Sequence, residues 1–315
     1  MKPWNIRYVL SAVLSCLALS QAQIPAGDPA PAAAMPDVAQ TAAAIIAPGA
    51  KVELLADGFE FTEGPAADRE GNVYFTDQPN DRILKWSLDG KLTTFLQPCG
   101  RANGLDFDAK GNLLACADEK NQLWSIAPDG RIQVLIERFE GKLLNGPNDL
   151  WVHPKGGIYF TDPFYRRNYW KRGEKEQDGE HVYLFDPARS TLARVATDLV
   201  RPNGIVGDAD GLKLYVADIG AGKTYRYAIL EDGRLAEKTL FTNLGSDGMA
   251  LDAEGNLYLT GKGVSVFNAV GEKIAHIPIN ESWTANVAFG GRDRQTLFIT
   301  ARDSLYAVRT RVRGL

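Results

Sequence analysis

The sequence is poor in the residues that most catalytic sites require. It contains three histidines and three cysteines among 315 residues, and no serine stands in a Gly-x-Ser-x-Gly motif. It also has no glycine-rich loop of the kind that binds nucleotide phosphates. These absences argue against a serine hydrolase and against a nucleotide-binding enzyme. His153 falls in a predicted turn and His276 in a predicted outer strand, so we assign neither a catalytic role.

A large charge imbalance is missing as well. The formal net charge is −4, with 45% hydrophobic and 23% charged residues. This is the composition of a globular protein with enough residues for a large core. The charge is too small, and of the wrong sign, for a nucleic-acid-binding protein. We therefore expect no nucleic-acid partner.

The N-terminal hydrophobic run is too short to cross a bilayer, which takes about 20 apolar residues. This run, residues 8–20, follows Lys2 and Arg7 and is followed by small residues up to Ala22. The order predicts a signal peptide at residues 1–22 and export to the periplasm or the medium, with no membrane association after cleavage. An uncleaved anchor and a lipoprotein modified at Cys16 are the alternatives. Residues 23–48, rich in proline and alanine, are predicted to form a linker.

Few cysteines are left for disulfides. After removal of the signal peptide only Cys99 and Cys116 remain, just before and just after the phrase that starts at Asn103. In an oxidising compartment two such residues can form a disulfide. We favour two buried thiols, with the disulfide as the alternative.

What the sequence does contain is one phrase that recurs along the chain. The first copy, EGPAADREGNVYFTD, consists of two strand-like runs joined by a Gly-Asn turn. The later copies start at positions 103, 148, 203 and 247, and a more divergent copy starts at 286. Every copy opens with an oxygen-bearing side chain, and these six are Glu63, Asn103, Asn148, Asn203, Asp247 and Asn286. A fixed repeat of this kind indicates a repeat architecture.

The segments between the copies supply two further strands in each unit. The Asp89-Gly90 and Asp129-Gly130 dipeptides between apolar runs are hairpin signals. A unit of about 40–45 residues with four antiparallel strands is typical of a propeller blade. Six units predict an all-β, six-bladed β-propeller that forms a single domain over residues 49–315. The last unit offers three strands, so we expect the N-terminal strand at residues 51–56 to complete the last blade.

One unit carries a long insertion. Residues 163–181 combine the aromatic residues Phe164, Tyr165, Tyr169 and Trp170 with a mixed run of charges. Long ordered loops in compact domains are often covers of active sites, so the insertion is a candidate lid over the channel. A solvated surface loop is the alternative.

The six phrase-opening residues are predicted to meet around the central channel, because the innermost strand of every blade lines it. We call these six the ring residues. Two carboxylates among amides in a protected channel need a counter-charge, and a divalent cation supplies one. The donors are all oxygen atoms, which favours calcium, with magnesium, manganese and, less well suited, zinc as alternatives. The competing interpretation is that these are turn residues, but Glu63 is a poor turn residue and Pro65 and Pro147 indicate a fixed backbone.

The aspartates that end four of the copies are a different class of residue. They close the second strand of the phrase, away from the ring register. We expect them to accept hydrogen bonds from loops within their own blades and assign them a structural role. The four are Asp77, Asp118, Asp162 and Asp218.

At these residues the sequence resembles the gluconolactonase/regucalcin-like family, also known as the senescence marker protein and luciferin-regenerating enzyme-like family. The matching motifs are EGP at Glu63, NGPND ending at Asp149, RPNGI around Asn203 and SDGMALDAEGNLY around Asp247. The resemblance covers about residues 51–310, in order. It implies a six-bladed propeller with one divalent metal ion, commonly calcium, in the channel.

The resemblance also implies roles for individual residues. Glu63, Asn203 and Asp247 match the metal ligands of the family, and Asn148 falls where members have either a fourth ligand or a substrate contact. The aspartate that matches Asp247 is often assigned the role of base. Asn103 is implied only as a channel-lining residue. Arg101 lies close to Asn103 but outside the matched motif, and we retain it as a candidate substrate contact.

Our leading hypothesis is metal-dependent hydrolysis of a sugar lactone, a small-molecule substrate. The metal ion would polarise the lactone carbonyl, and Asp247, or alternatively Glu63, would take a proton from the attacking water. Asn103 and Asn148 would orient hydroxyl groups, and Tyr165 with Trp170 would cover an apolar sugar face. The alternatives are a phosphotriesterase-type hydrolase with the same metal site and a non-catalytic carbohydrate- or protein-binding propeller with a structural metal ion.

Overall fold

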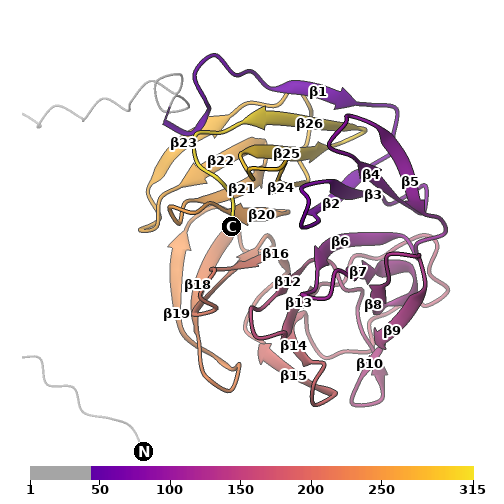
Figure 1. Cartoon of the computed structure of the whole chain (residues 1–315). Helices are drawn as coiled ribbons and strands as arrows, with labels where there is room; N and C mark the ends of the chain where they lie inside the picture. Colours follow the sequence, from indigo (N-terminus) through magenta and orange to yellow (C-terminus); the bar gives the residue numbers. More distant parts are fainter. Residues whose placement is uncertain (1–43) are drawn as a thin grey trace, which may run out of the picture. The chain divides into compact units, whose positions relative to one another are not determined.

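Six four-stranded antiparallel sheets surround a central axis in the computed structural model, which describes residues 44–315 (Figure 1). Neighbouring innermost strands contact one another in the order β2, β6, β12, β16, β20, β24 and back to β2, so the ring is closed. This is the predicted six-bladed β-propeller.

The blades follow one another along the chain. Blade 1 contains β2 (Thr62–Ala67), β3 (Val73–Asp77), β4 (Arg82–Trp86) and β5 (Leu92–Leu96). Blade 2 contains β6 (Ala102–Phe107), β7 (Leu113–Ala117), β8 (Gln122–Ile126) and β9 (Ile132–Ile136). Blade 3 contains β12 (Leu150–Val152), β13 (Ile158–Asp162), β14 (His181–Asp186) and β15 (Thr191–Ala196). Blade 4 contains β16 (Pro202–Gly207), β17 (Lys213–Asp218), β18 (Lys223–Ile229) and β19 (Leu235–Thr242). Blade 5 contains β20 (Met249–Leu251), β21 (Leu257–Gly261), β22 (Gly263–Phe267) and β23 (Lys273–Ile277).

Blade 6 joins the two ends of the propeller. Its sheet has the order β1-β26-β25-β24, from β1 (Glu53–Ala56), β26 (Ser304–Arg309), β25 (Thr296–Ala301) and β24 (Asn286–Gly290). Glu53 pairs with Ala307 and Leu54 with Tyr306 in antiparallel register. The predicted closure by the N-terminal strand is therefore confirmed.

Burial along the strands explains the hydrophobic pattern of the phrase. The second strand of a blade lies between the two neighbouring blades, and β3, β7 and β13 are buried at every position. Strands buried on both faces read as nearly continuous apolar runs. Outer strands are more exposed, as β9 shows with its first three residues exposed.

Apolar residues collect in six clusters, one between each pair of neighbouring blades. Phe75 of blade 1 packs with Phe298 of blade 6 in one of these clusters, and Tyr159 of blade 3 packs with Val216 of blade 4 in another. Each blade therefore depends on both neighbours for its core, and the ring is stabilised as a whole.

The two cysteines lie in different clusters. Cys99 packs between blades 1 and 2, whereas Cys116 of β7 packs between blades 2 and 3. Both are buried and neither is in a disulfide. Burial raises the pKa of the Cys99 thiol to about 12 and that of Cys116 well above its usual value, so both are unreactive thiols.

Some structure lies outside the predicted blades. A short hairpin, β10 (Arg138–Phe139) and β11 (Lys142–Leu143), and a 3-10 helix, η1 (Asp118–Lys120), belong to the connections around blade 2.

Ile45, within the predicted linker, is only 2% exposed and joins the cluster between blades 5 and 6. Ordered packing thus begins before the predicted boundary at residue 49. The predicted signal peptide lies outside the described residues, and none of the helices in residues 44–315 could span a membrane.

Glycines beside the ring residues allow neighbouring inner strands to approach closely. A Cβ atom on Gly64 would lie 2.1 Å from the carbonyl oxygen of Asn103, and one on Gly204 would lie 2.6 Å from that of Asp247. A Cβ atom on Gly248 would lie within 2 Å of the Asn286 side chain. Such distances are far below van der Waals contact, so any larger residue would push the blades apart.

The close approach leads to a testable stability prediction. Gly204→Ala should lower the free energy of unfolding by about 1–3 kcal/mol, because the added methyl group overpacks the junction of blades 4 and 5. The matched control is Gly173→Ala, since a Cβ atom there meets nothing within 4 Å. Thermal or urea unfolding would measure both, and equal stability of the two variants would contradict the tight-packing argument.

Candidate active site

The ring residues lie at or just before the start of the six inner strands. Glu63, Asn103, Asn203 and Asn286 are in β2, β6, β16 and β24, whereas Asn148 and Asp247 lie two residues before the start of β12 and β20. Five of the six are buried, with 2–6% of their surface exposed, and Asp247 is partly exposed. The repeat register has brought residues from all six blades to one level of the channel.

Threonines of the phrase fix the backbone of the ring. The Thr76 hydroxyl donates to the carbonyl oxygen of Asn103 at 3.1 Å, and the Thr161 hydroxyl donates to that of Asn203 at 2.7 Å. Each bond links the second strand of one blade to the ring residue of the next. The threonine of the FTD motif, which ends the repeated phrase, therefore helps to position the next blade in addition to the blade that contains it.

Glu63 is a buried carboxylate with no basic partner. Its Oε2 accepts the N–H of Gly64 at 2.8 Å and a longer bond of 3.4 Å from the Asn286 amide. It forms no ion pair within the described residues. Burial, and then the negative charge of Asp247, raise the pKa of Glu63 well above its usual value. A cation at this place would stabilise the ionised carboxylate and so oppose that rise.

Asp247 is the second carboxylate of the ring, and two donors hold it. The indole Nε1 of Trp283 donates to Oδ2 at 2.6 Å, and the amide Nδ2 of Asn203 donates to Oδ1 at 2.9 Å. Burial raises the pKa of Asp247 to about 6, and these two hydrogen bonds oppose the rise. The carboxylate therefore has a fixed orientation at the partly exposed side of the ring.

The amide of Asn203 has a defined orientation. Its Nδ2 also lies 2.9 Å from the hydroxyl oxygen of Tyr165, so the nitrogen side of the amide is occupied by Tyr165 and Asp247. The carbonyl side, Oδ1, therefore points away from both. A cation ligand needs its oxygen free in this way.

Two ring amides have no partner in the protein. The side chains of Asn103 and Asn148 are 5% and 4% exposed, and neither makes a side-chain hydrogen bond within residues 44–315. Neither amide is among the fully enclosed polar groups, so a ligand, an ion or water can reach both.

The donor set has a distinct composition. No cluster of three His, Cys, Asp or Glu side chains able to hold a metal ion occurs in the part of the chain that the structure describes. Any ion at the ring would depend on two carboxylates supplemented by amide oxygens, which is a donor set for a hard cation. The predicted ligands Glu63, Asn148, Asn203 and Asp247 supply that set.

Comparison with known proteins identifies the family. Residues 61–303 match the model of the family described as "SMP-30/Gluconolactonase/LRE-like region". The chain belongs to this family.

Three relatives illustrate the likeness. The gluconolactonase of Zymomonas mobilis is 29% identical over 301 residues, which cover 86% of this chain and 84% of the relative. The structure of a gluconolactonase from Xanthomonas campestris superposes with a TM-score of 0.80 at 31% identity, covering 85% of this chain and 92% of that one. A calcium-binding regucalcin from Agrobacterium tumefaciens shares the fold, with a TM-score of 0.71, 20% identity and coverage of 84% and 96%.

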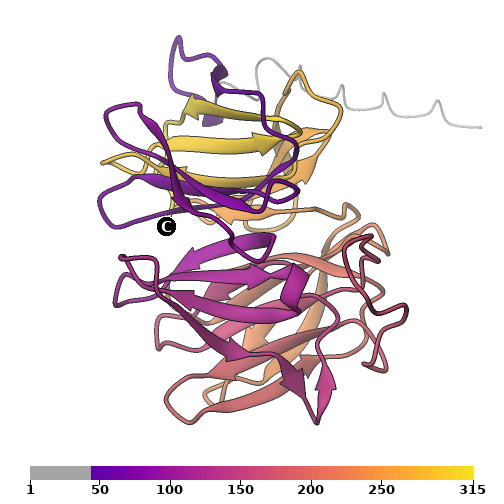
Figure 2. The same ribbon diagram turned by 90° about the vertical axis from the view of Figure 1, so that its right-hand side faces the viewer.

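In this member of the gluconolactonase family the insertion reaches the ring. Tyr165 contacts Asn203, and two guanidinium groups lie over its aromatic ring, Arg167 at 5.4 Å and Arg201 at 5.2 Å from the ring centre. In the side view of Figure 2 the insertion extends on the face of the propeller away from the C-terminus. Its position over Asn203 agrees with the predicted cover better than with a loop that only solvent surrounds.

Asp118 anchors the insertion. Its Oδ2 accepts Arg167 Nε at 2.7 Å and the Tyr169 hydroxyl, and its carbonyl oxygen accepts the Trp170 indole N–H at 3.0 Å. The equivalent Asp162 accepts the backbone N–H groups of Asn145 and Gly146, as expected of a structural residue. Asp118 therefore departs from the predicted role: the loop that leads into β6 donates the N–H groups of Cys99 and Arg101 to Asp81, and Asp118 accepts bonds from the insertion instead.

Asp77 and Asp218 behave as predicted. Asp77 accepts backbone N–H groups of Glu60 and Phe61, and Asp218 accepts those of Val200 and Arg201. In both cases the bonded loop leads into the inner strand of the same blade.

Arg101, a predicted substrate contact, is engaged elsewhere. Its guanidinium group donates to the carbonyl oxygen of Pro79 and lies 4.7 Å from the centre of the Tyr169 ring. It therefore supports the insertion. Sequence reasoning missed Trp283 and Arg167, because neither belongs to the repeated phrase and no pattern in the sequence marks them.

The Asp118 anchor generates a prediction about the insertion. Asp118→Asn should increase the rate of tryptic cleavage at Arg166, Lys171 and Lys175 several-fold, because the charge-assisted bond from Arg167 is worth about 1.5–3 kcal/mol. Mass spectrometry of timed digests would locate the cuts. Asp186→Asn, which removes a carboxylate from a turn of blade 3, is the control. Equal cleavage of both variants would contradict the anchoring role.

Proposed function

We propose that the protein is a lactonase that hydrolyses sugar lactones at the ring, with a divalent cation bound there. The observation that carries this proposal is the pairing of two carboxylates, Glu63 and Asp247, that form no ion pair among residues 44–315, with amides at equivalent ring positions that have no side-chain partner in the protein. The gluconolactonases among the relatives support the substrate class.

The ring residues fit a hard divalent cation. Glu63, Asn148, Asn203 and Asp247 would hold it, and the calcium-binding relative supports calcium. When bound, the ion would supply Lewis-acid polarisation of the lactone carbonyl and compensate the developing negative charge. The two carboxylates match its formal charge, and the orientation of the Asn203 amide leaves an oxygen free for it.

Asp247 is the proposed base. It is the partly exposed carboxylate of the pair, whereas Glu63 is 2% exposed and hydrogen-bonded to its own backbone. Asp247 takes a proton from the water that attacks the carbonyl carbon. The carbon–oxygen bond of the lactone ring then breaks, and the proton goes to the departing oxygen to give the hydroxy acid.

Other residues position the substrate. Asn103 and Asn148 have free amides that orient ring hydroxyl groups. Tyr165 is placed to cover one face of the sugar from the insertion. Trp170 has a structural task, because its indole docks on Asp118. We also propose that the enzyme acts after export, as the N-terminal sequence predicts.

A metal-depletion experiment tests the function. Protein treated with a chelator should lose hydrolysis of gluconolactone, followed by acid release, and should regain it with calcium. Asp247→Ala should lower kcat/KM by about 10²–10⁴. Asp232→Ala, in an exposed turn of blade 4, serves as control. Full activity of Asp247→Ala would refute the role of base, and preference for an organophosphate ester over every lactone would refute the substrate class.

A second prediction concerns Trp283 as a positioning residue. Trp283→Phe removes the donor to Asp247 Oδ2 but keeps an aromatic ring. We expect kcat to fall roughly tenfold or more with little change in KM, since a hydrogen bond to a charged group is worth about 1.5–3 kcal/mol. The control is Trp124→Phe, which loses a comparable indole bond to Gln122 in β8. A rise in KM at constant kcat would show that Trp283 contacts substrate instead.

A further inference from the structure

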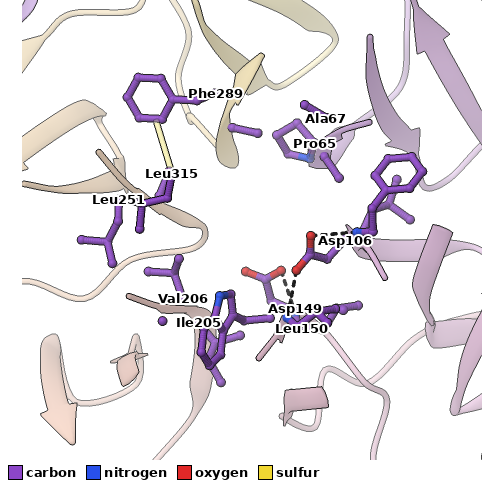
Figure 3. A pocket seen from close by; sticks show the side chains of 18 of the residues that line it. Pro65, Ala67, Asp106, Asp149, Leu150, Ile205, Val206, Leu251, Phe289 and Leu315 are labelled. Carbon is purple, nitrogen blue, oxygen red and sulfur yellow. Dashed lines mark hydrogen bonds between the residues drawn. The ribbon is translucent and has the colours of Figure 1, made fainter. Parts of the chain in front are cut away.

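A cavity lies in the same channel, next to the ring. It has a volume of about 460 Å³ and is lined by the residues that follow the ring positions on all six inner strands (Figure 3). The C-terminal residue, Leu315, lies at its rim. The cavity is therefore on the face away from the insertion, and the proposed hydrolysis makes no use of it.

The walls of this cavity combine apolar and polar surface, and the apolar part comes from large side chains. Phe107, Trp151, Val206, Leu251 and Phe289 contribute side chains from five different blades. Three of these are aromatic, so the cavity offers ring faces as well as aliphatic surface. The volume is in the range that holds a small organic molecule.

Two carboxylates interrupt the apolar lining. In Figure 3 Asp106 and Asp149 point toward each other from the same side of the cavity. Asp106 accepts the N–H groups of Phe107 at 2.7 Å and Val152 at 2.9 Å, and Asp149 accepts that of Leu150 at 3.0 Å. Asp149 is only 7% exposed.

Neither carboxylate forms a close ion pair among residues 44–315, although the charge of Arg294 acts on Asp106 at longer range. The arginines at the rim are used elsewhere: Arg294 donates to the carbonyl oxygens of Asp68 and Phe289, and Arg69 donates to that of Ala109. His153 is also occupied, because Nε2 bonds the carbonyl oxygen of Gly211 and Nδ1 accepts the N–H of Lys155.

Asp149 is exceptional in the repeat. The equivalent position is glycine in four other copies of the phrase: Gly64, Gly104, Gly204 and Gly248. Glycine is there because neighbouring strands approach closely. A carboxylate in that place is costly to bury, and burial also raises the pKa of Asp106 to about 6. A cation in the cavity would offset both costs.

We propose that this cavity binds a small organic cation, in which an ammonium group attached to an apolar body lies against Asp106 and Asp149. The carboxylates attract the charge, the aromatic walls favour a cation near their faces, and the remaining surface buries the apolar body. A bare metal ion fits less well, because it would leave most of the volume and the apolar walls unused. The proposal does not depend on lactone hydrolysis.

Isothermal titration calorimetry on the full chain, with calcium present, tests the proposal with a matched pair of probes. The 2-phenylethylammonium ion should bind at one site with an affinity at least tenfold higher than that of neutral 2-phenylethanol, which has nearly the same shape. Asp106→Asn should weaken ammonium binding about tenfold and leave the weak binding of the alcohol unchanged. Asp129→Asn removes the same charge from an exposed turn of blade 2 and should change neither affinity.

A second variant keeps the proposal testable if Asp106→Asn fails to fold. Val206→Trp fills the cavity and leaves both carboxylates in place, so it should abolish binding of both probes while thermal unfolding reports an intact fold. Equal affinity for the two probes, no saturable ammonium binding, or binding that survives in both variants would each overturn the proposal. Lactonase activity is recorded separately, so its absence would refute the proposed function without affecting this result.

Discussion

The close approach of neighbouring inner strands is the constraint on which the rest of the structure depends. Gly204 and Gly248 let the backbones of blades 4, 5 and 6 meet, and the Thr161 hydroxyl ties the backbone of Asn203 to the preceding blade. Only at this spacing do six residues from six blades share one level of the channel. The six apolar clusters between the blades supply the stability that keeps the strands together. The active site is thus a consequence of ring closure, and no single blade contains enough of it to bind a ligand.

Burying acidic groups in this channel has an energetic cost that the fold meets in different ways. Asp162 is satisfied by backbone N–H groups, and Asp118 is satisfied by Arg167 from the insertion. Glu63 and Asp247 have hydrogen bonds but form no close ion pair within the described residues, and Asp247 interacts with the charge of Arg167 only at longer range. Since ionised groups are seldom buried without a close counter-charge, this difference separates the structural acids from the acids that we expect to bind a ligand.

The features that follow from the repeat could be predicted from the sequence alone. Because the phrase recurs in register, Glu63 and Asp247 could be placed together, and the three-stranded last unit required β1 to complete it.

Contacts made by segments outside the repeat could not be foreseen. Trp283 lies in a connection between blades, and its bond to Asp247 depends on the path of that connection. Arg101 was expected near substrate from its proximity to Asn103 in the chain, but Pro79 and Tyr169 bind its guanidinium group. The redirected role of Asp118 likewise depends on where the insertion folds.

The two ends of the channel are physically connected. Asn286 lines the cavity that contains Asp106 and Asp149, and its amide also donates to Glu63 in the ring. Asp149 lines the same cavity and is adjacent in sequence to Asn148, whose backbone carbonyl accepts the N–H of Gly104. A group that moves the Asn286 side chain would therefore change one hydrogen bond of Glu63. The propeller thus places two chemically different sites on one set of strands, and the residues between them belong to both.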